Sequence, residues 1–274
     1  MWRFLGLCAL ILALDATSTP TQAGAPPLPG PPARPFLARM NGPCPKKCQW
    51  IAVQGAIDKT TLSVFDELVA TLGDAKPPVF FNSVGGDVAS AVLLGERLRK
   101  LGLDTAIAAT RLNSKDFGIL GSSPATAPRA DVVVSGRGFC ASACALAFAG
   151  GLRRYAPLET SLGLHQMLQP EQDVQQKVAV FEQGEVSLNG QVVGKTSRLV
   201  GTKTVTRHLP KGAPPDAVYS AVEAYFTKMG VDGPKAVALM RKMRPEKMDW
   251  LTPEQILETR LATARKRADA LLDF

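Results

Sequence analysis

The chain has 274 residues, of which 46% are hydrophobic and 20% charged, and its formal net charge is +8. This composition is typical of a globular protein with one large or two small domains, and it excludes a disordered, collagen-like or coiled-coil chain. The basic excess favours non-specific attraction to anions. No run of Lys and Arg interleaved with aromatic residues occurs, so no nucleic-acid partner is expected.

The first 23 residues have the pattern of a signal peptide. Arg3 precedes an apolar run over residues 4–14, which is shorter than the roughly 20 residues of a membrane-spanning helix. Residues 21–23 offer a cleavage site. We expect removal of residues 1–23 and export to the periplasm or the medium, with a retained anchor helix as the alternative. No integral membrane segment is expected in the mature chain, because no other stretch has 18 uninterrupted apolar residues.

Six prolines crowd the segment that follows, between residues 24 and 38. This density favours extended polyproline II and opposes a helix or a central strand, so residues 24–41 are predicted to be a linker. The folded domain is then expected over residues 42–274.

The mature chain keeps four cysteines, Cys44, Cys48, Cys140 and Cys144. In an exported protein an even number of thiols favours disulfides, here with three possible connectivities. Two Cys-x3-Cys pairs also resemble halves of a zinc site, but no His lies beside either pair. The spacing differs from the Cys-x-x-Cys of redox motifs. We therefore expect disulfides and no metal or other cofactor.

Short apolar strands alternate with amphipathic helices along the domain, which predicts an α/β layered fold of parallel strands joined by crossover helices. Two segments without clear periodicity, about 110–130 and 170–213, are interpreted as insertions. The second contains Asn189-Gly190, which favours a type I′ turn and a hairpin. The expected strands are 50–55, 79–82, 105–109, 131–134 and 161–165, and the expected helices are about 60–72, 88–101, 140–148, 216–229 and one after Pro253.

Three segments carry residues suited to chemistry. Gly85-Gly86 joins a buried strand to a helix, where the backbone can approach a bound group, although a plain tight turn has the same pattern. Ser142 lies at an expected helix start, where a serine is commonly a cap. His165 ends a strand and is one of only two histidines, the other being His208.

In this order, Asn-Ser-x-Gly-Gly, Ala-Ser-Ala at a helix start and an apolar strand ending in His resemble the proteolytic subunit of Clp protease and the wider Clp-protease/crotonase superfamily. Ser142 and His165 are 23 positions apart, similar to the family interval. The connection 149–157 and the Leu-Thr-Pro-Glu segment 251–254 also match the family pattern. The resemblance spans residues 50–260 and looks closest to small exported members of the superfamily.

The resemblance implies a role for each matching residue. Ser142 takes the position of the nucleophile and His165 that of the general base, since an imidazole can activate a hydroxyl that is otherwise a poor nucleophile. The amides of Gly85 or Gly86 and of Ala143 would form the oxyanion hole.

The chain departs from the family pattern at the third member of the triad. The family Asp aligns with Met248, and Asp249 lies one position late. Asp249 is the preferred candidate to orient His165, ahead of Asp216 and Asp232, with none of them as the alternative. Val84 replaces a usual proline, and segment 170–213 is expected to cover or narrow the cleft.

These observations favour an exported serine hydrolase of peptidase type that acts on a peptide or a small ester or amide through an acyl-enzyme. A catalytically silent relative that binds or assembles is the alternative, and an acyl-CoA enzyme of crotonase type is a weaker one. No Gly-x4-Gly-Lys-Ser/Thr motif occurs, so the activity is expected to be independent of ATP. Family members pack as trimers or rings, so a homo-oligomer is a further expectation.

Overall fold

The computed structural model describes residues 31–40, 49–112, 127–133, 138–243 and 248–272. The chain divides into two compact units, an α/β unit that contains residues 28–167 and 213–274, and a second unit that contains residues 168–212. The predicted signal peptide 1–23 and the cysteines Cys44 and Cys48 lie outside the described residues. No helix in the described part of the chain is both long and apolar enough to span a membrane.

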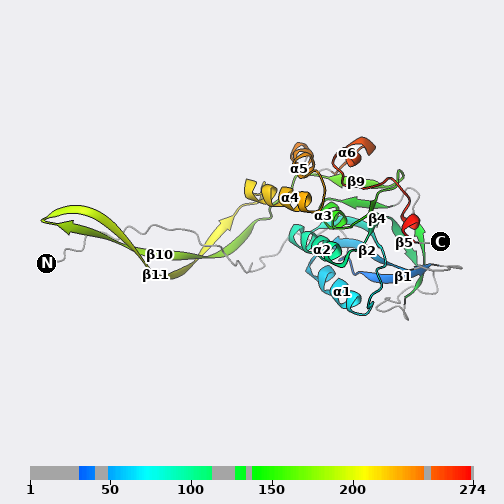
Figure 1. The fold of residues 1–274 in the computed structure, drawn as a ribbon, viewed down its shortest axis with the longest axis horizontal. Coiled ribbons are helices and arrows are strands. Elements are labelled where there is room, and N and C mark those ends of the chain that lie inside the picture. Colours follow the sequence, from blue (N-terminus) through cyan, green and yellow to red (C-terminus); the bar gives the residue numbers. More distant parts are fainter. Residues whose placement is uncertain (1–30, 41–48, 113–126, 134–137, 244–247, 273–274) are drawn as a thin grey trace. The chain divides into compact units, whose positions relative to one another are not determined.

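A mixed, largely parallel sheet forms the centre of the α/β unit (Figure 1). Its main path runs β12-β9-β7-β3-β2-β1-β6-β5, and β4 and β8 extend it from β3. The central pairs β2–β3, β3–β7 and β7–β9 are parallel, and β1–β2, β5–β6 and β9–β12 are antiparallel. The strands are β1 (Phe36–Met40), β2 (Gln49–Ile57), β3 (Val79–Gly86), β4 (Thr105–Ile107), β5 (Ala109–Leu112), β6 (Arg129–Val133), β7 (Phe139–Ala141), β8 (Arg154–Tyr155), β9 (Ser161–Leu164) and β12 (Asp249–Trp250).

Helices connect these strands, and the first two of them begin at capping residues that the sequence supplies. Asp58 forms a capping box with Thr61, and Asp87 accepts the amide of Ser90. Gly102 ends the second helix with φ 68°. The alternation of these helices with the strands of a largely parallel sheet confirms the predicted α/β class. The helices are α1 (Lys59–Ala70), α2 (Val88–Leu101), α3 (Ala143–Ala149), α4 (Asp216–Lys228), α5 (Gly233–Lys242), α6 (Pro253–Glu258) and the 3-10 helix η3 (Ala268–Leu271).

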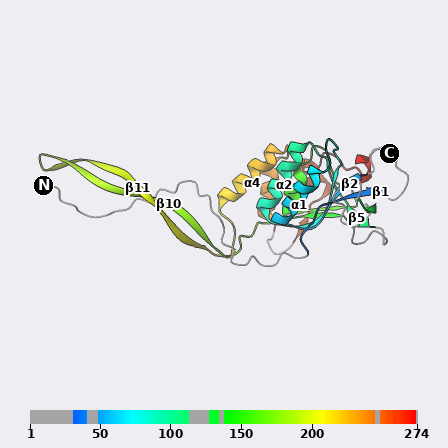
Figure 2. The ribbon, with the colours of Figure 1, turned by 90° about the horizontal axis from the view of Figure 1, so that it is seen from below.

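Both faces of the sheet are buried, which explains why residues 50–53 of β2 are apolar without a break. Ile51 and Val53 pack in the cluster that contains side chains of α1 to α5. Trp50 and Ala52 point to the opposite face, into a second cluster that Leu271 helps to close. Successive residues of a strand point to opposite faces, so each face receives every second residue of β2. Figures 1 and 2 show α1 and α2 beside the sheet.

Two boundaries predicted from the sequence are wrong. The proline-rich segment 24–41 was expected to be a linker, but Phe36–Met40 form β1, between β2 and β6 in the sheet. Pro35 directly precedes this strand, a position where a missing N–H is tolerated, and no proline lies within it. The helix expected from Cys140 begins only at Ala143, because Cys140 belongs to β7.

A buried arginine, Arg154, binds the C-terminal segment to the rest of the α/β unit through hydrogen bonds. The guanidinium of Arg154 donates to the carbonyls of Leu261, Arg260, Gly151 and Met229 at 2.8–3.2 Å. Burial, with a smaller contribution from a neighbouring arginine, lowers the pKa of Arg154 to about 10, so it stays charged at neutral pH. Carbonyl acceptors therefore replace the water that this cation loses.

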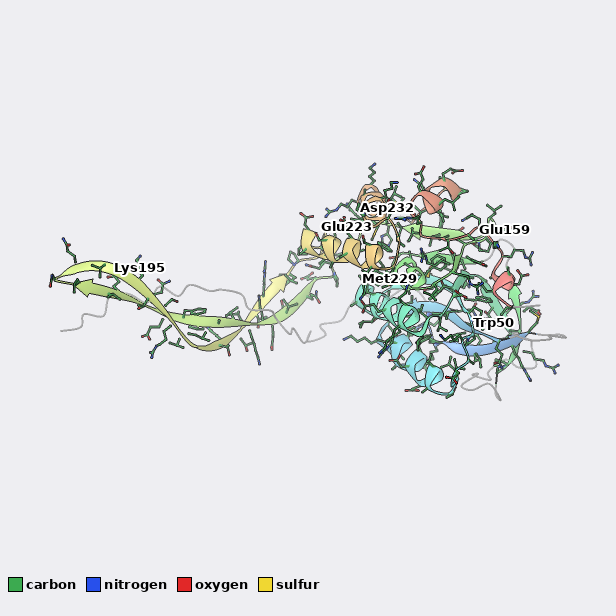
Figure 3. All side chains as sticks on the ribbon, in the orientation of Figure 1. Trp50, Glu159, Lys195, Glu223, Met229 and Asp232 are labelled. Atoms are coloured by element: carbon green, nitrogen blue, oxygen red, sulfur yellow. A yellow bond between two sulfur atoms is a disulfide. The ribbon has the colours of Figure 1, made fainter. Side chains whose placement is uncertain are left out.

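The second unit is a long antiparallel hairpin of β10 (Gln172–Leu188) and β11 (Gln191–Leu209). Its turn residues Asn189 and Gly190 have φ of 53° and 81°, as the predicted type I′ turn requires. All residues of β11 except Val205 and Leu209 are exposed. Figure 3 shows side chains projecting along the whole ribbon. The predicted insertion 170–213 is thus a two-stranded ribbon whose strands pair with each other.

Candidate active site

Ser142 occupies the turn between β7 and α3. Its backbone has φ 56° and ψ −126°, a conformation that an L residue adopts only when its surroundings impose it. The Ser142 side chain makes no capping hydrogen bond to α3, so the interpretation of this serine as a helix cap is wrong. The sharp strand-to-helix turn instead leaves the hydroxyl partly exposed.

The register of β7 and β9 brings His165 to this serine. Phe139 pairs with Ser161 and Ala141 with Gly163 in a parallel ladder, and the amide of Ser142 donates to the carbonyl of Gly163 at 2.9 Å. His165 directly follows β9, so it lies at the same end of the sheet. His165 Nε2 lies 2.7 Å from Ser142 Oγ. The two residues that the sequence placed 23 positions apart are therefore in hydrogen-bond contact.

The Gly85-Gly86 turn approaches the nucleophile through its first glycine. A Cβ at Gly85 would lie 2.5 Å from the carbonyl oxygen of Ala141, 2.8 Å from Ser142 Cβ and 2.9 Å from the amide nitrogen of Ala143. Gly86 packs instead against the backbone of Ile57 in β2. Of the two glycines, Gly85 is the one at the site.

The two amides proposed for the oxyanion hole differ in their present partners. Ala143 is the first residue of α3, and the first amides of a helix have no partner inside it. The amide of Gly85 donates to the hydroxyl of Ser83 at 3.1 Å, and that hydroxyl donates to the carbonyl of Gly55 at 2.6 Å. To serve in the oxyanion hole, the Gly85 N–H therefore has to give up its hydrogen bond to Ser83 and donate to the substrate oxygen instead.

The third triad position remains a prediction. The backbone of Asp249 pairs with Leu164, the residue before His165, and the Asp249 side chain lies outside what the structure describes. The two other candidates have different partners: Asp216 pairs with Arg241 at 2.7 Å, and Asp232 caps α5. Backbone placement thus agrees with the preference for Asp249.

An apolar cavity of about 250 Å³ adjoins the serine and the glycine turn. Ala141 and Val84 in its wall directly precede Ser142 and Gly85. Phe139 and Trp250 meet edge to face, with ring centroids 6.4 Å apart. Met248 completes the lining. The sequence analysis missed this pocket, because it assigned Ala141 to a helix, whereas in β7 Phe139 and Ala141 lie on one face of the strand.

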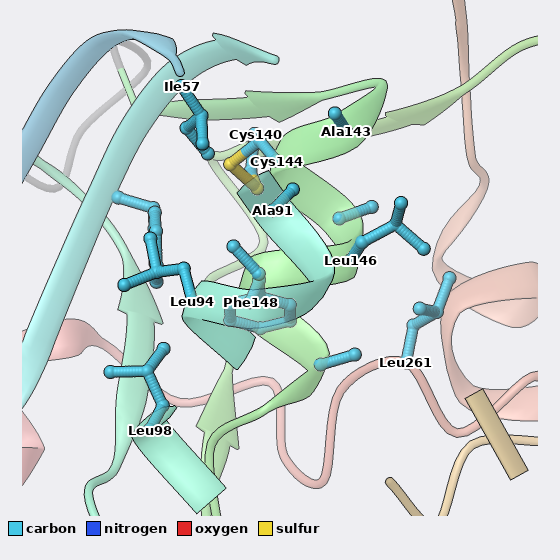
Figure 4. Packing of buried hydrophobic residues seen from close by; sticks show 14 of the residues in the cluster. Ile57, Ala91, Leu94, Leu98, Cys140, Ala143, Cys144, Leu146, Phe148 and Leu261 are labelled. Atoms are coloured by element: carbon cyan, nitrogen blue, oxygen red, sulfur yellow. A yellow bond between two sulfur atoms is a disulfide. The ribbon is translucent and has the colours of Figure 1, made fainter. Parts of the chain in front are cut away.

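A disulfide joins Cys140 and Cys144, with Cα atoms 5.2 Å apart. It is one of the pairings that the cysteine count left open, and it encloses Ser142 in a five-residue loop. Both cysteines are fully buried. Figure 4 shows the bond beside Ala91 of α2. Among the described residues, no group of three or more His, Cys, Asp or Glu side chains is placed to hold a metal ion.

Comparisons with known proteins find similar solved structures but no match in sequence. No family model and no curated protein matches the chain. A mutant of the 1510-N membrane-bound stomatin-specific protease matches with TM-score 0.44 and 14% identity, covering 78% of each chain. A second mutant of that protease, in complex with a substrate peptide, matches with TM-score 0.43 and 16% identity over 78% of this chain and 74% of the other.

A third match is a mutant of ClpP1 from Listeria monocytogenes, with TM-score 0.38 and 10% identity over 81% of this chain and 93% of that one. The chain is similar to ClpP1.

Proposed function

We propose that the chain is a serine hydrolase of peptidase type, which cleaves peptides or small esters and amides through an acyl-enzyme on Ser142. The single observation that carries this proposal is the 2.7 Å contact between Ser142 Oγ and His165 Nε2. It joins a hydroxyl on a strained turn to the ring of one of only two histidines in the chain. A structural role for the pair gives no reason for that strain.

The reaction follows from these positions. His165 Nε2 takes the hydroxyl proton as Ser142 Oγ attacks the substrate carbonyl carbon, and the carbonyl oxygen becomes an oxyanion beside the amide of Ala143. His165 then gives the proton to the leaving amine or alcohol. Water, activated by the same imidazole, hydrolyses the acyl-enzyme and frees Ser142.

The substrate class follows from the pocket. Val84, Phe139, Ala141, Met248 and Trp250 offer apolar surface, so an apolar side chain or acyl group next to the reacting carbonyl is favoured. We place the enzyme outside the cytoplasm, after removal of residues 1–23, because of the N-terminal pattern, and the disulfide supports this placement. Asp249 is proposed to orient His165 from β12.

A fluorophosphonate probe tests the proposal, because it phosphonylates an activated serine irreversibly. We expect the mature protein to become labelled at Ser142, with the site located by peptide mass spectrometry. Ser142→Ala and His165→Ala should each abolish labelling.

Two matched controls come from the hairpin. Ser187→Ala and His208→Ala remove the same groups from an exposed ribbon, and labelling should stay at the wild-type rate. Folded, oxidised protein that stays unlabelled would overturn the proposal and favour a silent binding protein.

A further inference from the structure

The disulfide Cys140–Cys144 spans the residue that we propose as the nucleophile. Cys140 lies in β7 and Cys144 is the second residue of α3, so the bond ties the strand to the helix across the Ser142 turn. Ser142 is the central residue of the five that the bond encloses. The two sulfur atoms therefore fix the ends of the segment whose middle carries the reacting hydroxyl.

Few hydrogen bonds form within the turn itself. α3 has seven residues, and Ser142 gives it no side-chain cap. The backbone bonds at the turn are Ser142 N–H to Gly163 at 2.9 Å and Ala145 N–H to the carbonyl of Ser142 at 3.0 Å. A residue with φ 56° relaxes toward negative φ unless its neighbours hold it.

The size of the loop shows what the bond contributes. Cross-linking stabilises a protein mainly by restricting the unfolded chain, and this effect is smallest for the shortest loops. A loop of five residues gains less in this way than a long loop, whereas a fixed Cα–Cα distance of 5.2 Å directly restricts the backbone at Ser142. The bond thus has its main effect on local geometry.

That geometry controls two parts of the site at once. Gly85 packs against Ala141, Ser142 and Ala143, so a shift of the turn moves both the hydroxyl and the first amide of α3 relative to Gly85. The same shift lengthens the contact with His165, which β9 holds from the other side. Displacements of about 1 Å at such sites cost on the order of 100-fold in rate.

We propose that Cys140 and Cys144 are positioning residues, whose disulfide holds Ser142 in its catalytic conformation, so that the hydrolase reaches its full rate only when this bond is oxidised. The inference rests on the proposed function. Reduction by a dithiol delivers two electrons and two protons, turns both Sγ atoms into thiols and oxidises the dithiol to its cyclic disulfide. The chain loses no atom in this step, so only the restraint on the turn changes.

The test compares oxidised and reduced wild-type protein. Dithiothreitol is applied until alkylation and mass spectrometry show that Cys140 and Cys144 are free thiols, and the second-order rate of fluorophosphonate labelling is then measured. We expect this rate to fall by about 10–100-fold and to recover when the protein is reoxidised. With a p-nitrophenyl ester, kcat should fall and KM should stay within about threefold, since the turn acts on the reacting atoms.

Variants separate this bond from the other cysteines. The double variant Cys140→Ala/Cys144→Ala should label as slowly as the reduced protein while its circular dichroism spectrum stays native. Cys44→Ser/Cys48→Ser is the matched control and should label at the wild-type rate.

Each outcome decides between the two proposals. Oxidised wild type that does not label overturns the proposed function, and this inference with it. Oxidised and reduced proteins that label at the same rate overturn the inference alone. If the double alanine variant fails to fold, the reversible reduction of the wild type decides the question.

Discussion

The α/β unit and the hairpin are built from the same chain by two different balances of forces. In the α/β unit, two apolar clusters bury both faces of the sheet, and the buried Arg154 donates to four backbone carbonyls. The hairpin has a continuous backbone ladder but exposes almost all of β11. An isolated two-stranded ribbon is marginally stable in water, whereas a buried sheet is not.

Charge pairs show the same contrast. In the hairpin, Asp173 faces His208 at 2.8 Å and Glu182 faces Arg198 at 2.9 Å, both as directly opposed cross-strand pairs. These groups remain open to water, which limits what each pair contributes. The comparison teaches that buried, hydrogen-bonded structure is concentrated in the α/β unit, which also contains Ser142 and His165, and four experiments test that conclusion.

The largest expected effect is the loss of Arg154. Arg154→Met leaves several buried carbonyls without a donor and should destabilise the α/β unit by about 3–5 kcal/mol in urea unfolding. Arg198→Met, which removes an exposed arginine from the hairpin, should cost less than about 1 kcal/mol. Equal losses in the two variants would contradict the contrast between the units.

A second experiment compares two glycines with positive φ. Gly85→Ala forces a Cβ against the Ser142 turn and should lower the rate of fluorophosphonate labelling by about 10²–10³-fold, the usual cost of a damaged oxyanion hole. Gly190→Ala also strains its backbone, but nothing lies within 4 Å of its new Cβ. Labelling of this hairpin variant should equal that of the wild type. A Gly85→Ala protein with normal labelling would remove this glycine from the site.

The third experiment concerns the apolar pocket. Trp250→Ala removes the largest wall and should lower kcat/KM for an ester with a bulky apolar acyl group by about 10–100-fold, while the acetyl ester changes little. Leu188→Ala, at an exposed position near the tip of the hairpin, should change neither value. Parallel losses for both esters would show that the pocket does not select the substrate.

The smallest effect is expected from removing the hairpin itself. Gln169 and Gly212 pair through both backbone groups, at 2.8 and 3.1 Å, so the chain leaves and returns at one point. Replacing residues 171–210 by Asn-Gly should change the free energy of unfolding of the α/β unit by less than about 1 kcal/mol. It should leave the labelling rate within twofold of the wild type. A large fall in the labelling rate would show instead that the hairpin belongs to the site. That result would agree with the expectation from the sequence that segment 170–213 covers or narrows the cleft.

The sequence predicted those parts of the fold that local rules determine. Asp58 and Gly102 are start and stop signals that work through the nearest turn of the helix, and Asn189-Gly190 determines its turn in the same way. The pair Ser142 and His165 was predicted from spacing and family pattern. The hydrogen bond between them depends on the parallel register of β7 and β9, which no local signal contains.

The errors arose where tertiary contacts override local preference. Proline density concealed β1, since five consecutive residues after Pro35 are enough for a strand when their neighbours bury them. The small residues around Cys140 fit a helix as well as a short strand. α5 was missed although Asp232 and Pro234 give a start signal, and the pocket at Trp250 was missed because its walls come from three separate strands.

The second face of the sheet carries a consequence for how the protein is made. Trp50 and Phe80 pack in a cluster that is completed by Leu271 and Leu272, about 200 residues later in the sequence. During translation this cluster stays incomplete until residues 268–272 have left the ribosome. Nascent or truncated chains that lack the 268–272 segment should therefore depend on chaperones and aggregate in their absence.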